Sequence, residues 1–63
     1  MTARQARIAI WLQELDAARR TVEGIRRDME RGLLPRDHPA LQRNLERLER
    51  ARNELRRLGA TVT

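Results

Sequence analysis

The chain contains no cysteine, so no disulfide can stabilise it. Its single histidine stands in no cluster with metal-ligand spacing, so neither a metal site nor a cofactor is expected. Its 63 residues form one domain at most, and such a chain buries only about 60% of the surface its unfolded form exposes. Because small domains usually need a disulfide, a metal or a partner, association with another chain remains as the way to enlarge the core.

Phenylalanine, tyrosine and lysine are also absent, and there is one tryptophan. The core must therefore be aliphatic, and all 14 basic residues are arginine. The planar arginine fork suits carboxylate or phosphate, although a GC-rich genome or a thermophilic host explains the same bias. Charged residues make up 37% of the chain, but the apolar residues are periodic, which argues against disorder.

Long apolar runs are missing as well. The longest, from Ile8 to Leu12, is shorter than the core of a signal peptide and far shorter than the ~20 residues of a membrane span. We therefore expect a cytoplasmic protein with no membrane partner.

A first helix is predicted from about residue 3 to 31. Thr2 and Gln5 have the spacing of a capping box, and Gly32 is placed to end the helix in a left-handed conformation. Between them, apolar residues alternate spacings of three and four, which is the heptad pattern of a left-handed coiled coil. These positions are Ile8, Trp11, Leu15, Ala18, Val22, Ile25 and Met29.

Residues 32–38 are predicted to form the turn and residues 39–58 the second helix, followed by a short C-terminal tail. Asp37 or His38 is expected to cap this helix, with Pro39 in its first turn and Gly59 at its end. A short turn makes the helices antiparallel neighbours. The expected fold is all-α: one domain, residues 1–63, folded as a coiled-coil-like two-helix antiparallel hairpin.

A tight turn also predicts which residues face each other. The first helix is longer by roughly 13 Å, so the second should end near Trp11 and leave Ile8, Ile10 and part of Trp11 near or beyond its end. The expected facing pairs are Met29 with Leu45, Ile25 with Leu48, Ala18 with Leu55 and Leu15 with Leu58.

Small residues form a stripe along the first helix, which the spacing places opposite the heptad seam. Either this stripe packs on another chain, or its alanines merely favour helix and Ile10 is a stray exposed residue. A second copy would give a four-helix-bundle homodimer, and a different protein can use the same surface. The candidate interface residues are Ala3, Ala6, Ile8, Ile10, Trp11, Ala17, Thr21 and Gly24.

Arginines form rows on the outer faces of both helices, and the net charge is +5, which fits a nucleic-acid partner. Acidic residues are interleaved with them, however, including Glu23–Arg27 and Glu46–Arg50 at a favourable spacing. No aromatic residue is expected on these faces, so a solvated, ion-paired surface is the competing interpretation. The candidate contacts are Arg20, Arg27, Arg31, Arg43, Arg47, Arg50 and Arg57.

Arg52 and the Asp37-His38 pair need separate interpretation. Arg52 stands at the edge of the leucine seam, where it either fixes the register or packs its stem and extends its guanidinium to water. The Asp37-His38 pair has no nucleophile or second ligand near it in sequence, which favours helix capping over proton transfer.

No motif of a catalytic, cofactor or metal site occurs, so an enzyme is not expected. The favoured function is a non-enzymatic protein-interaction module that acts through the apolar faces of the first helix. It could be a small regulator, an adaptor or a phage-type accessory protein. The alternative is a dimer that binds RNA or DNA without reading sequence.

Overall fold

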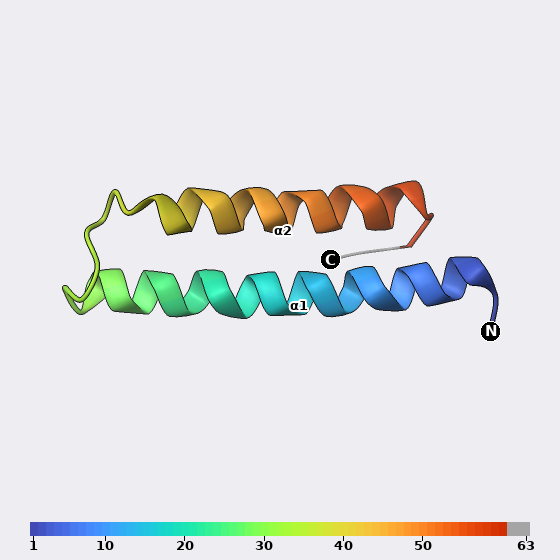
Figure 1. Cartoon of the computed structure of the whole chain (residues 1–63), viewed down its shortest axis with the longest axis horizontal. Coiled ribbons are helices and arrows are strands. Elements are labelled where there is room, and N and C mark those ends of the chain that lie inside the picture. Colours follow the sequence, from blue (N-terminus) through green and yellow to red (C-terminus); the bar gives the residue numbers. More distant parts are fainter. Residues whose placement is uncertain (61–63) are drawn as a thin grey trace.

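The computed structural model describes residues 1–60 and contains two antiparallel helices packed against each other (Figure 1). Helix α1 spans Ala3–Glu30 and helix α2 spans Pro39–Arg57. Residues 1–60 include no strand, and their envelope is a rod of 45 × 17 × 15 Å. The all-α hairpin predicted from the sequence is confirmed. The end of the predicted C-terminal tail, residues 61–63, lies outside the described residues.

The ends of α1 form as the local sequence predicts. The Gln5 amide donates to Thr2 Oγ1 at 3.1 Å, and the Thr2 amide donates to Gln5 Oε1 at 2.8 Å, which completes the capping box. At the other end Gly32 has φ of +75°, and the Leu33 amide donates to the Asp28 carbonyl at 2.8 Å. This is a Schellman motif, in which the left-handed glycine lets the chain satisfy the last carbonyls of the helix.

Helix α2 is bounded in the same manner. His38 is its N-cap, with Nδ1 accepting a hydrogen bond from the Ala40 amide at 3.1 Å, and Pro39 follows in the first turn. Gly59 has φ of +77°, and the Ala60 amide donates to the Leu55 carbonyl at 2.9 Å. Of the two residues expected to cap α2, His38 has the role.

The core is a single aliphatic seam between the helices. Leu55, Ala18 and Ala51 are fully buried, and small alanines allow the two backbones to approach closely. Ile8, Trp11 and Ala60 are partly buried and pack against this cluster. Within residues 1–60, the buried residues are Leu15, Ala18, Val22, Ile25, Met29, Leu48, Ala51 and Leu55.

The predicted register of the two helices is wrong. It placed Arg47 opposite residue 26, but Arg47 is hydrogen-bonded to Glu14, and Gly59 lies against Arg4. Relative to the prediction, α2 is therefore displaced along α1 by roughly ten residues, or ~15 Å at 1.5 Å per residue. The four predicted facing pairs, from Met29–Leu45 to Leu15–Leu58, do not hold.

The connection between the helices causes this displacement. It does not reverse the chain tightly at Gly32, and α2 begins set back from the C-terminal end of α1 (Figure 1). Arg36, in the connection, lies beside Met29. The longer helix consequently extends beyond α2 at both ends, whereas the sequence placed the overhang at the N-terminus alone (Figure 1). Ile8 and Trp11 are thus covered within the hairpin rather than left beyond α2.

Candidate binding groove

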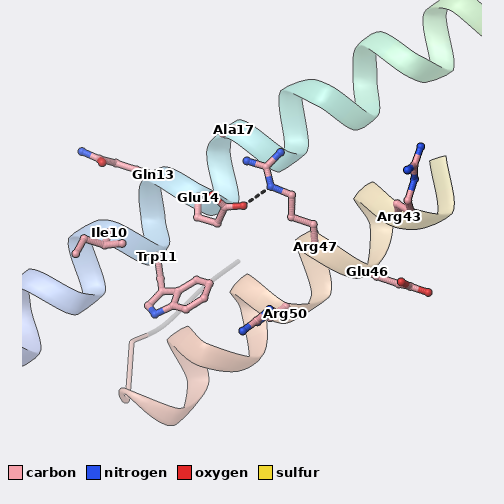
Figure 2. Close-up of a pocket in the computed structure, with 9 residues that line it drawn as sticks. All are labelled: Ile10, Trp11, Gln13, Glu14, Ala17, Arg43, Glu46, Arg47 and Arg50. Carbon is pink, nitrogen blue, oxygen red and sulfur yellow. Dashed lines mark hydrogen bonds and ion pairs between the residues drawn. The ribbon is translucent and has the colours of Figure 1, made fainter. Parts of the chain in front are cut away.

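One side of the hairpin carries an open groove of ≈ 930 Å³ between the N-terminal half of α1 and the first part of α2 (Figure 2). Both sets of candidate residues from the sequence contribute to it. Its lining comprises Ile10, Trp11, Gln13, Glu14 and Ala17 from α1, and Arg43, Glu46, Arg47 and Arg50 from α2.

The α1 wall of the groove is mainly apolar. Ile10 is 62% exposed and Ala17 is exposed one heptad further along the helix. Trp11 is half-buried, since it packs on the core cluster while it also lines the groove. At 100° per residue, Ile10 and Ala17 come about 120° from the middle of the seam. This part of the small-residue stripe therefore borders the groove, at about 120° from the seam rather than directly opposite it as predicted.

The α2 wall is cationic. Arg43, Arg47 and Arg50 follow one another at spacings of four and three residues, so they share one face of the helix. All three are exposed. A ligand in the groove would meet an apolar surface on one helix and guanidinium groups on the other.

A single ion pair crosses the groove. Arg47 Nε donates a hydrogen bond to Glu14 Oε1, which joins α2 to α1 (Figure 2). This bond lowers the pKa of the Glu14 carboxyl below its ordinary value and raises that of the Arg47 guanidinium. The pair fixes one guanidinium and neutralises one of the two acids in the groove.

Besides the Glu14–Arg47 pair, the groove is lined by one further acid and two further arginines. The second acid, Glu46, accepts a hydrogen bond from Gln42 Nε2 at 3.2 Å. Within residues 1–60, neither Arg43 nor Arg50 forms an ion pair. The groove therefore offers two guanidinium groups to an incoming ligand.

The remaining predicted interface residues lie outside the groove lining. Ala3 and Thr21 are exposed on α1, whereas Ala6 and Gly24 are half-buried. A Cβ added to Gly24 would have no atom within 4 Å, so packing inside the hairpin does not require a glycine there. Ile8 is half-buried and packs on the core cluster.

The other candidate arginines are all exposed. Arg20 pairs with Asp16, and Arg57 Nη1 lies 3.3 Å from Glu54 Oε1. The expected pairs Glu23–Arg27 and Glu46–Arg50 are not formed in the described part of the chain, and Arg31 caps the end of α1. Arg52 has its guanidinium at the surface, 4.0 Å from Glu49, which agrees with a packed stem and a solvated head.

Sequence reasoning missed Gln13, Glu14 and Glu46 as groove residues, and it expected no aromatic residue beside the arginines. Trp11 does line the groove together with Arg43, Arg47 and Arg50. A signal for Glu14 and Arg47 was present, because both flank the seam with opposite charges. These opposite charges identify the two residues as a pair only when the register of the helices is known.

The described helices offer few other possibilities. His38 is engaged as the cap of α2, and residues 1–60 contain no group of three His, Asp or Glu side chains placed to hold a metal ion. Neither α1 nor α2 is long and apolar enough to cross a membrane. Comparisons of the chain with protein-family models, curated proteins and solved structures gave no match.

Proposed function

We propose that this hairpin is a non-enzymatic protein-interaction module, a small regulator or adaptor that binds another polypeptide along the exposed flank of α1. The observation that carries the proposal is the exposure of Ile10, 62%, on the wall of a groove whose other wall is cationic. An apolar side chain presented beside arginines is typical of the centre of a protein interface, where aliphatic and arginine contacts combine.

Nucleic-acid binding is the second candidate, because Trp11 and three arginines line one groove. Several features favour a protein. Glu46 lines the same groove and would repel phosphates, Arg47 is already bonded to Glu14, and the Trp11 side chain is partly occupied by the core cluster. The phosphate backbone of RNA or DNA also makes no use of Ile10 and Ala17.

A second copy is the simplest protein partner. Two hairpins that pair through α1 would form a four-helix-bundle homodimer and would cover Ile10 from both sides. Sedimentation equilibrium decides this point, since a dimer would dissociate when Ile10 is replaced by aspartate.

Affinity capture followed by titration tests the proposed function. Wild-type hairpin should retain a polypeptide that the purified hairpin binds again in isolation, and Ile10→Asp should abolish that binding because an unpaired charge is expensive in an apolar contact. Leu33→Asp is the matched control, because Leu33 is 68% exposed in the turn, away from the groove. Retention of RNA or DNA that falls steeply with salt, and is unaffected by Ile10→Asp, would contradict the proposal.

A further inference from the structure

We infer that the groove binds an acidic amphipathic helix of another protein, with aliphatic residues against Ile10 and Ala17 and carboxylates against Arg43 and Arg50. The inference rests on the proposed function and adds the chemistry of the partner. A helix is the expected ligand because the groove runs between the antiparallel helices α1 and α2, where a third helix can pack along both.

Rows of arginines border the small-residue stripe of α1 on both sides. Arg43, Arg47 and Arg50 stand on the α2 side. Around α1, on the side away from α2, a second row of exposed arginines comes about 70° beyond the stripe at 100° per residue. That second row consists of Arg20, Arg27 and Arg31.

The acids within the groove leave two of its arginines without an ion pair. Glu14 is held by Arg47, and Glu46 is bonded to Gln42. Arg43 and Arg50 form no ion pair with any residue in 1–60. Carboxylates that complement them must therefore come from the partner, where they would add to the rate and specificity of binding.

The same charges disfavour a second copy as the occupant. Because arginine rows border the stripe on both sides, a two-fold pairing of α1 with α1 sets arginine rows against arginine rows in either orientation. Each copy also carries a net charge of +5. An acidic partner removes this repulsion.

The dimensions of the groove fit a segment of one helix. Its lining runs over residues 10–17 of α1 and 43–50 of α2, about 10 Å along each helix, which two turns of a partner helix cover. Since every α-helix has the same rise, partner acids spaced four and three residues apart match the spacing of Arg43, Arg47 and Arg50.

A display library provides the test. Each member is a 21-residue helix with a fixed leucine and alanine face, and with either glutamate or lysine at each of four flanking positions. Selection on the intact hairpin should enrich glutamate over lysine by about tenfold, the scale expected for two exposed ion pairs and the loss of repulsion. The double variant R43E/R50E should reverse the preference toward lysine.

The matched control is R19E/R26E, which changes the net charge equally at two exposed positions on the other side of α1. Circular dichroism verifies that both variants fold. If the control also reverses the preference, the effect is one of net charge and the inference is wrong.

Retained helices without charge preference would overturn the inference but leave the proposed function standing. Failure to retain any helix overturns the inference, with a dimeric hairpin identifying a second copy as the occupant. Nucleic-acid binding lost in R43E/R50E would overturn the proposed function as well.

Discussion

Arg47 Nε donates a hydrogen bond to Glu14 Oε1, and this bond joins α2 to α1 between residues 33 positions apart in the chain. It crosses the groove, and it is formed only in the register that brings the two walls of the groove together. Both features of the hairpin that concern function, the apolar wall and the cationic wall, face each other because of that register.

The Glu14–Arg47 pair predicts a pH dependence of stability. The bond lowers the pKa of Glu14 from its ordinary value of 4.5, so its contribution is fully present above pH 4.5. It disappears as the pH falls through the lowered pKa of the folded state. Thermal unfolding at low salt should therefore show a lower midpoint for Glu14→Gln than for wild type at pH 7, and the two midpoints should converge in acid.

Glu23→Gln serves as the control for this experiment, because Glu23 is exposed and is not ion-paired within residues 1–60. Its midpoint should follow that of wild type. A Glu14→Gln difference that persists unchanged below the lowered pKa would show that the side chain acts by packing and not by charge.

Leu55 is predicted to be the most sensitive position of the core. Its side chain is fully buried between the helices, so Leu55→Ala should reduce the free energy of unfolding by about 2–5 kcal/mol. Leu33→Ala, at an exposed position in the turn, should change it by less than about 0.5 kcal/mol. Chemical denaturation followed by circular dichroism measures both, and equal effects would refute the described core.

Two glycines should respond to alanine in opposite directions. Gly32 has a positive φ, so Gly32→Ala should destabilise the hairpin by about 1 kcal/mol although space is available. Gly24 is helical and a Cβ there meets nothing within 4 Å, so Gly24→Ala should stabilise it by about 1 kcal/mol. Differential scanning calorimetry of the two variants gives the sign directly, and a destabilising Gly24→Ala would contradict the open surface at that position.

Local chemistry accounts for what was predictable in the fold. Thr2 with Gln5, Gly32, Pro39 and Gly59 act through bonds within a few residues, so their roles follow from spacing alone. The heptad positions likewise identify the seam, and Leu15, Ala18 and Leu55 are buried as the pattern requires.

The register could not be predicted in this way, because it depends on the path of residues 32–38. Apolar positions alternate at steps of three and four along both helices, so a slide of about ten residues aligns apolar positions again, and sequence pattern alone distinguishes such registers weakly. The groove depends on register in turn. The sequence singled out Ile10, Trp11, Arg43 and Arg50 separately, but only the three-dimensional arrangement brings them to one surface.

Amide chemical-shift mapping of isotope-labelled hairpin, titrated with a glutamate-flanked helix from the display library, locates the binding surface residue by residue. The largest changes should occur at Ile10, Ala17, Arg43 and Arg50 and at the indole N–H of Trp11, all of which line the groove. Changes concentrated instead around Arg19, Arg26 or Leu33, with the groove signals unmoved, would contradict binding in the groove.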